Sequence, residues 1–307
     1  MRKILLFLLS LAACAASADV LLVENFEYDD FVTPLVKQSD WTNDYFSSGS
    51  FSNAVITNGL SFDGYDGCGI GNAMLLDGPT GSYHPKREFP KVTEGNVYVA
   101  FMLRAASCYK NGFVFALMQS LSQTDYLMNG RILFDVDEYY DAYFGFQYGK
   151  ATDKHISDKI ADPQKVYLVV VEYKIIEGKN NDEISLYVFD EMPDSQPEQP
   201  LIGPLKDSSI DDLNPSVLLC RGLTDAWLIF DGFRVATTWD EAVAAGTCPT
   251  EEALENLTAL TADEVEVFSL LGSGLGVYKT TDINTLPAGL YILRDNNNRT
   301  RKITIAN

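Results

Sequence analysis

The strongest constraint on the fold is an alternation of side chains with a period of two residues. In the segment 96–103, Val97, Val99, Phe101 and Leu103 point to one side, and the residues between them, also apolar, point to the other. A period of two is the period of a β-strand, and a strand that is apolar on both sides is buried on both faces. The alternation therefore predicts an all-β protein whose central strands are covered on both faces.

Turn residues separate the predicted strands. The run 165–176 is followed by a Gly-Lys-Asn-Asn cluster at 178–181 and an apolar run at 184–189, which predicts a long hairpin. Further strands are expected at 20–28, 53–57, 73–76, 82–89, 112–118, 130–136, 142–148, 216–221 and 226–236, and one helical turn at 238–245. Antiparallel strands without crossover helices bury their apolar faces against one another as two stacked sheets. We therefore predict a two-sheet jelly-roll sandwich over residues 19–247.

The charge balance limits the class of partner. The chain has 43 acidic residues against 23 Lys and Arg, a net charge of −20. A protein this acidic is repelled by nucleic-acid phosphates and by anionic lipid surfaces. We therefore expect no nucleic-acid partner.

The first 18 residues have the pattern of an export signal. Arg2 and Lys3 are followed by an apolar run at 4–13, and small residues at 16–18 are typical of a cleavage site. No other stretch is apolar enough to span a bilayer. We therefore expect residues 1–18 to be removed and the mature chain to have no transmembrane segment.

An alternative processing site overlaps this signal. The sequence LAAC at 11–14 resembles a lipobox, in which Cys14 would be acylated and become the first mature residue. The first expected strand begins at Val20, which leaves almost no tether between a lipid on Cys14 and the fold. We favour ordinary cleavage after Ala18, and the lipoprotein alternative stays open.

Four cysteines follow the signal: Cys68, Cys108, Cys220 and Cys248. An even number in an exported chain indicates disulfides, and four cysteines allow three pairings. Proximity along the chain favours Cys68 with Cys108, and Cys220 with Cys248. Zinc is a weaker alternative, because there is no Cys-x-x-Cys pair.

Several motifs in residues 20–245 resemble a known module. They are LLVENFEY at 21–28, Trp41, GYDGCGIGNA at 64–73 and FDGFRVATTW at 230–239. Together they resemble the concanavalin A/laminin G-like jelly-roll module of secreted Bacteroidetes proteins. The resemblance implies a structural role for these motifs and no particular ligand.

The C-terminal segment resembles a second family. VEVFSLLG at 265–272, LPAGLYILR at 286–294 and RKITIAN at 301–307 resemble a type IX secretion C-terminal sorting domain of a Bacteroidetes-type bacterium. The matching motif residues are Leu286, Pro287, Ala288, Gly289, Tyr291 and Lys302. We expect a linker and this domain at 248–307, folded as a small β-sandwich with strands near 264–270, 275–280, 289–294 and 300–305.

This second resemblance implies where in the cell the protein is delivered. Such domains carry their cargo to an outer-membrane translocon and its sortase, and the cargo is then attached to the cell surface or released. We therefore expect a secreted or outer-membrane surface protein of a Gram-negative bacterium, with any cleavage at 246–258. A terminal immunoglobulin-like domain without a targeting role is the alternative.

Enzymatic activity is not expected. Jelly rolls of this kind include glycoside hydrolases with an E-x-D-x-x-E strand, whose paired carboxyls need a defined spacing. The nearest match is DVDEYYD at 135–141, where Asp135 and Asp137 share a face but Tyr140 stands in place of the second Glu. A solvated acidic turn is the favoured interpretation. A glycosidase that uses Asp135, Asp137 or Glu138 is the alternative.

A ligand-binding role is the favoured function. Tyr139, Tyr140 and Tyr143 could stack on sugar rings, and Asp135 and Asp137 could add polar contacts. The alternation of Phe144, Phe146 and Tyr148 predicts core instead. We therefore predict a non-catalytic protein that binds glycan or cell-surface ligands, with a structural or adhesive protein as a further alternative.

A non-catalytic binding protein of this kind requires no cofactor. Ca²⁺ is the one ion that the loop carboxylates would suit, because Asp63, Asp66, Asp77 and the residues 135–141 offer oxygen ligands. No EF-hand spacing is present, so we favour solvated turn residues over a calcium site.

Overall fold

A computed structural model describes residues 19–28, 33–43, 55–77, 84–122, 127–150, 152–248, 264–269, 274–286, 289–294 and 300–305. The chain divides into two compact units, Met1–Thr247 and Cys248–Asn307. None of the described helices has the length and apolarity needed to cross a bilayer.

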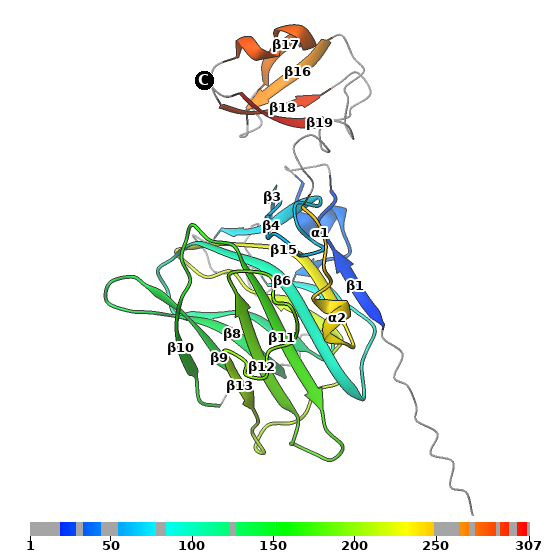
Figure 1. Cartoon of the computed structure of the whole chain (residues 1–307), viewed down its shortest axis with the longest axis vertical. Helices are drawn as coiled ribbons and strands as arrows, with labels where there is room; N and C mark the ends of the chain where they lie inside the picture. The colour runs from blue at the N-terminus through cyan, green and yellow to red at the C-terminus, as the bar shows by residue number, and fades with distance from the viewer. Residues whose placement is uncertain are drawn as a thin grey trace, which may run out of the picture. The chain divides into compact units, whose positions relative to one another are not determined.

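The first unit contains an eight-stranded antiparallel sheet (Figure 1). Its order is β13 (Ile202–Leu205), β12 (Glu183–Phe189), β11 (Tyr167–Ile175), β6 (Gly95–Cys108), β15 (Ala226–Ala236), β4 (Asn72–Asp77) and β3 (Val55–Asn58), with β1 (Val20–Glu24) also paired to β15. The predicted long hairpin is β11 and β12, whose register pairs Leu168 with Phe189 and Lys174 with Glu183.

A seven-stranded antiparallel sheet forms the second layer. Its order is β10 (His155–Ile160), β9 (Ala142–Gln147), β8 (Met128–Val136), β7 (Gly112–Met118), β14 (Val217–Cys220), β5 (Pro85–Glu88) and β2 (Thr42–Asn43). The short helices α1 (Leu35–Gln38) and α2 (Trp239–Ala242) complete the described secondary structure of this unit. The all-β, two-sheet prediction is thus confirmed.

The main core lies between the two sheets. Phe101 of β6 packs against Phe115 of β7 with ring centroids 5.0 Å apart, and both side chains are fully buried. The other face of β6 is also covered, because Tyr98 and Met102 belong to a second buried cluster that includes Trp239 of α2. Burial of β6 on both faces confirms the expectation from its uniformly apolar sequence.

Strand β10 was not expected from the sequence. His155 and Ile156 begin this edge strand, and most of its side chains are exposed. An edge strand with little burial carries no apolar alternation, so the period-two signal is missing.

The predicted disulfide pairing is wrong. Cys68 is bonded to Cys248, whereas Cys108 and Cys220 are free and buried. Distance along the chain does not measure distance in the fold. An isolated bridge joins Tyr65 to Ala245, and the backbone nitrogen of Gly246 donates to the Gly64 carbonyl at 2.8 Å. These contacts bring the segment after α2 beside the 64–68 turn.

The second unit is a four-stranded antiparallel sheet with the order β17 (Gly274–Lys279), β16 (Glu264–Ser269), β18 (Gly289–Arg294) and β19 (Thr300–Ile305). These strands match the four that the sequence predicts, but the described strands form one sheet and not the predicted small β-sandwich. A 3-10 helix, η1 (Thr280–Thr285), precedes Leu286, and Ile283 packs with Val265 and Leu293 in the small core.

The sorting-motif residues fall in different parts of this unit. Leu286 and Tyr291 are buried in its core. Gly289 begins β18 and pairs with Ile305, and Lys302 pairs with Ile292 through the backbone. Pro287, Ala288 and the side chain of Lys302 lie outside the described residues.

Candidate functional site

The turn between β8 and β9 carries the residues predicted to bind ligand. Asp137 accepts hydrogen bonds at Oδ1 from the backbone nitrogens of Tyr139 and Asp141, both at 2.9 Å. Tyr140 adopts a φ of +68°, a left-handed conformation that is uncommon for a bulky residue. The Asp137 carboxylate therefore fixes a tight turn whose tip presents Tyr139 and Tyr140.

The predicted aromatic residues separate into two groups. Tyr139 and Tyr140 are 76% and 67% exposed. Tyr143 is half-buried, and its hydroxyl lies 3.4 Å from Oδ2 of Asp137. The other three, Phe144, Phe146 and Tyr148, are buried in the main core, as their alternation predicts. Only the turn residues therefore present their rings to solvent.

Tyr109 joins these exposed tyrosines from another strand. It follows the end of β6, is 55% exposed, and meets the Tyr140 ring edge-to-face with centroids 5.8 Å apart. The two rings border a hollow of about 150 Å³ that is also lined by Ala105, Ser107 and Pro163. We call Tyr109, Tyr139 and Tyr140 the tyrosine cluster. Its rings, with a hollow beside them, are suited to stacking on an apolar ligand face.

Sequence reasoning missed Tyr109. The available signal was local, because Tyr109 precedes the Lys110-Asn111-Gly112 turn and so leaves the apolar alternation of β6. Its partner Tyr140 comes from a different sheet, and no local pattern reports that contact.

The carboxylates of this turn hold backbone and side-chain partners. Oδ1 of Asp135 accepts a hydrogen bond from Nδ2 of Asn111 at 3.1 Å, and Oδ1 of Asn111 accepts one from the backbone nitrogen of Val136 at 2.8 Å. Asp137 is occupied by the turn, and Glu138 is exposed. The arrangement fixes the turn and does not set two carboxyls on either side of a cleft.

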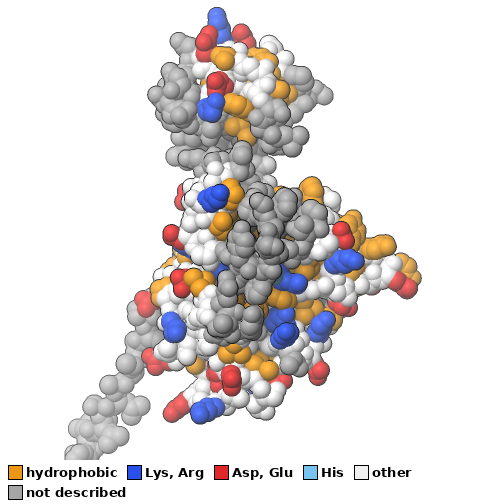
Figure 2. Space-filling view, turned by 180° about the vertical axis from the view of Figure 1, so that it is seen from behind, with side chains coloured by type: hydrophobic (Ala, Val, Ile, Leu, Met, Phe, Trp, Pro, Cys, Tyr) orange, Lys and Arg blue, Asp and Glu red, His pale blue; other side chains and the backbone are white. Residues whose placement is uncertain are grey.

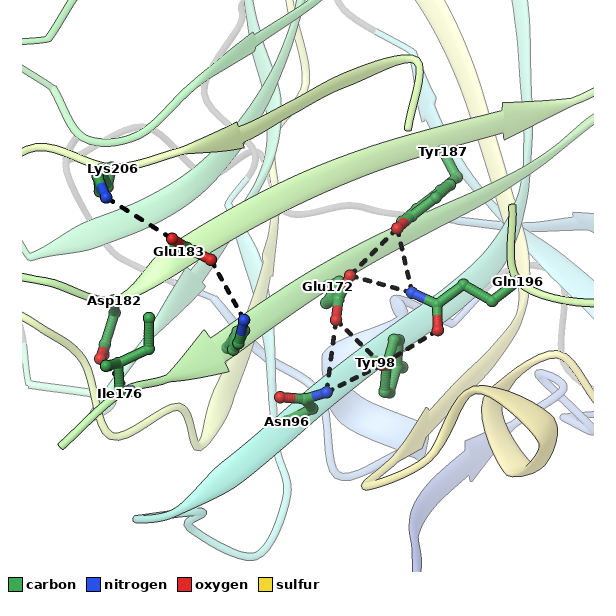
Figure 3. A network of polar contacts seen from close by, with 10 residues as sticks. Asn96, Tyr98, Glu172, Ile176, Asp182, Glu183, Tyr187, Gln196 and Lys206 are labelled. Atoms are coloured by element: carbon green, nitrogen blue, oxygen red, sulfur yellow. Dashed lines mark hydrogen bonds and ion pairs between the residues drawn. The ribbon is translucent and has the colours of Figure 1, made fainter. Parts of the chain in front are cut away.

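Glu172 of β11 is the acceptor in a second polar network, on the outer face of the eight-stranded sheet (Figure 3). It accepts hydrogen bonds from the Tyr98 hydroxyl at 3.0 Å, the Tyr187 hydroxyl at 3.2 Å and Nε2 of Gln196 at 3.1 Å. Burial, with a further contribution from the Glu172 charge, raises the pKa of Tyr98 to about 12. The tyrosines therefore stay protonated and donate, and the network ties the segment around Gln196 to the sheet.

The motifs of the first unit meet in the core. The Trp41 indole nitrogen donates to Oε2 of Glu24 at 3.0 Å, and the Trp41 ring packs against Phe26 and Phe233 with centroids 5.8 and 5.7 Å away. Asp231 is fully buried, and its carboxyl oxygens accept hydrogen bonds from the backbone nitrogens of Leu60 and Gly232. Burial raises the pKa of Asp231 to about 8. These residues hold the structure together, as the resemblance implies.

The candidate metal ligands of the 63–77 region have different surroundings in the described part of the chain. Asp63, Cys68 and Cys248 place one ligand atom each within 4.8 Å of one another, but both sulfurs belong to the disulfide. Asp66 forms an ion pair with Arg234 at 2.6 Å. The side chain of Asp77 lies outside the described residues.

Comparisons with known proteins identify similar folds. No protein-family model matches the chain, and no curated protein matches its sequence. The metal-free carbohydrate recognition domain of Emp46p is 11% identical with a TM-score of 0.38, covering 70% of this chain and 94% of that one. The cellulose-induced protein Cip1 is 13% identical with a TM-score of 0.43, covering 71% and 97%.

An enzyme is similar to the same degree. An endo-1,3-β-glucanase from Streptomyces sioyaensis is 9% identical with a TM-score of 0.42, covering 71% of this chain and 96% of that one. At such identities and TM-scores, the similarity transfers neither a ligand nor a residue role to this chain.

Proposed function

We propose that the first unit is a non-catalytic glycan-binding sandwich that uses the tyrosine cluster as its stacking surface. The observation that carries the proposal is the exposure of Tyr139 and Tyr140 at the tip of a turn that Asp137 fixes. Solvent-exposed aromatic rings in a rigid frame bind with little loss of conformational entropy.

The glycosidase alternative has no comparable support. Asp135 and Asp137 both accept hydrogen bonds that build the turn, and Tyr140 occupies the position of the second catalytic Glu. We therefore propose no catalytic role for Asp135, Asp137 or Glu138.

A glycan array probed with the chain from residue 19 to residue 307 tests the proposal. We expect binding to at least one glycan class, and a loss of about three- to tenfold in affinity when Tyr140 is changed to Ala. Val277→Ala, an exposed change in the second unit, should leave binding unchanged. Absence of binding to every glycan on the array would contradict the proposed function.

We further propose that the chain is exported and displayed or released at the cell surface by type IX secretion. The support is the signal pattern at 1–18, the motif at 286–294 and 301–305, and a disulfide between Cys68 and Cys248, a bond that persists in oxidising compartments.

Deletion of residues 286–307 in a bacterium with a type IX system should trap the protein in the periplasm. The deletion removes β18 and β19, so Lys302→Ala provides a second test that leaves both strands in place. Cell fractionation and surface proteolysis measure the result. Normal surface display of the truncated chain would contradict the sorting role.

A further inference from the structure

Two arginines lie over one phenylalanine ring on the outer face of the seven-stranded sheet. The guanidinium carbon of Arg131 is 4.0 Å from the centroid of Phe113, and that of Arg221 is 4.7 Å from it. We call Arg131 and Arg221 the arginine pair, and this side of the sheet the arginine face. In the view of Figure 2, several Lys and Arg side chains lie close together near the middle of the first unit.

Strand register brings these residues together. Arg131 of β8 pairs with Gln147 of β9. The next residue along β8, Ile132, belongs to the main core, so Arg131 lies on the opposite face. Arg221 directly follows β14, and its backbone nitrogen donates to the Val114 carbonyl at 2.7 Å. A Cβ at Gly112 would lie 2.6 Å from Cδ2 of Leu223 and 3.3 Å from Nη1 of Arg221, so the glycine leaves room for both side chains.

The described contacts of the arginine pair are all with neutral groups. Nη1 of Arg131 donates to Oε1 of Gln147 at 3.0 Å. Nε of Arg221 donates to Nε2 of His84 at 3.3 Å, and its Nη1 donates to the Phe113 carbonyl at 3.3 Å. Nε of Arg131 is buried and has no hydrogen-bond partner among the described residues.

Three other described arginines form ion pairs, whereas Arg104 donates to the Pro163 carbonyl at 2.8 Å. Arg87 pairs with Asp40, Arg234 with Asp66 and Arg294 with Glu266. The chain has 43 acidic residues to draw on, yet none of the described acidic side chains forms an ion pair with Arg131 or Arg221. Two positive charges therefore stand together without a negative partner in the described part of the chain.

This arrangement is costly for the folded protein. Burial, and then the charge of Arg221, lower the pKa of Arg131 to about 10, and burial also lowers the pKa of Arg221. One arginine over Phe113 would supply a cation–π contact, and the second adds repulsion. A local arrangement that holds two like charges together without a described counter-ion is typical of a functional site.

The chemistry of the pair selects its ligand. Arginine forks bind carboxylate and sulfate oxygens through paired, charge-assisted hydrogen bonds. A polyphosphate such as nucleic acid is disfavoured by the net charge of −20. The fitting ligand carries isolated anionic groups on an otherwise neutral or sparsely charged frame.

We propose that Arg131 and Arg221 form a subsite for a carboxylate or sulfate group of an acidic sugar. The identification of the ligand as a sugar rests on the proposed glycan-binding function. Strand β8 separates this subsite from the turn at Asp137 by about 20 Å at about 3.3 Å per residue, so the subsite and the tyrosine cluster can be tested separately.

Two pairs of polymers distinguish the anion from its sugar frame. A pectin that is methyl-esterified at most residues and its fully esterified form differ by isolated carboxylates, and a sparsely sulfated dextran and dextran differ by isolated sulfates. We expect the chain from residue 19 to residue 307 to bind at least one charged member about tenfold or more tightly than its neutral counterpart. Its preference should weaken as salt rises, because the interaction is ionic.

Variants assign the preference to the pair. Arg131→Gln and Arg221→Gln should each remove most of the preference for the charged polymer, and Arg131→Lys should restore part of it because Lys keeps the charge without the fork. Lys179→Gln, the same charge change in the exposed β11–β12 loop, is the matched control and should have no effect. Circular dichroism and thermal unfolding confirm that each variant folds.

Two outcomes of these measurements would overturn the subsite. Binding to glycans with no preference for charge, unaltered in both Gln variants, overturns the subsite and leaves the glycan function standing. Equal weakening by Lys179→Gln also overturns it, because the effect would then be one of net charge.

If no glycan binds at all, the proposed function fails and inorganic sulfate tests the pair alone. Sulfate should then raise the Tm of the unmodified chain more than that of the Arg131→Gln/Arg221→Gln double variant. An equal rise in both would overturn the subsite.

Discussion

The outer faces of the two sheets of the first unit differ in the partners that they give to their charged side chains. On the eight-stranded sheet, Trp239 of α2 packs on Tyr98 and Tyr187, and the carboxylate of Glu172 has several donors. On the seven-stranded sheet, Arg131 and Arg221 keep their charges without a described counter-ion. We call the first the covered face. The seven-stranded sheet also buries an apolar cluster on its outer face, so the two faces differ in their charged groups: Glu172 has several donors, and the arginine pair has no described acceptor of opposite charge.

The largest expected effect concerns the anchor of the covered face. Asp231 holds the backbone nitrogen of Leu60, a residue of the covering cluster, and its pKa is raised to about 8. The folded state keeps this proton up to about pH 8, whereas an unfolded Asp loses it near pH 4. In this window the unfolded state binds fewer protons, so stability falls as the pH rises.

Asp231→Asn isolates this effect. Relative to the Asn variant, the stability of the unmodified protein should fall by as much as about 5 kcal/mol between pH 4 and pH 9. Urea unfolding at a series of pH values measures the difference. A constant difference across the series would show that the Asp231 proton is not held by the fold.

The next effect compares one aromatic residue from each face. Trp239 is 7% exposed and contacts three aromatic rings, so Trp239→Ala should cost about 3–5 kcal/mol of unfolding free energy. Phe113 is only half-buried, so Phe113→Ala should cost less than about 2 kcal/mol while weakening acidic-glycan binding. Equal destabilisation by the two variants would remove the distinction between the faces.

The smallest effect compares the two charged centres. Glu172→Gln should cost about 1–2 kcal/mol, because Tyr98 and Tyr187 lose a charged acceptor. Arg131→Gln should change stability by less than about 1 kcal/mol, since relief of repulsion from Arg221 offsets the lost contact with Phe113. Chemical denaturation of both variants under the same conditions measures the contrast. A loss at Arg131 as large as that at Glu172 would indicate that the arginine pair is structural.

The turn chemistry could be predicted and the meeting of distant residues could not. Asp137 and Tyr139 are neighbours in sequence, and the acidic turn at 135–141 follows from local propensity. Tyr109 contacts Tyr140 because the C-terminal end of β6 lies beside the β8–β9 turn. The sequence therefore indicated half of the tyrosine cluster and missed the partner that completes it.

The arginine pair shows the same limit. Neighbouring residues of a strand point to opposite faces. Because Ile132 belongs to the core, alternation along β8 predicts that the adjacent Arg131 faces away from it. It does not predict Arg221 as a companion, because that contact requires β14 to pair with β7 in a particular register. Register between distant strands depends on how both sheets pack, so a single strand does not report it.

The sequence by itself determined that this chain is an all-β sandwich with a small β unit at its C-terminal end, since side-chain alternation and turn residues act over a few neighbours. Only the tertiary structure decided that Cys68 bonds to Cys248, that Tyr109 lies against Tyr140 and that two arginines converge on Phe113. Each of these contacts joins residues far apart in the chain. Their proximity depends on the packing of whole sheets, and local sequence carries no measure of it.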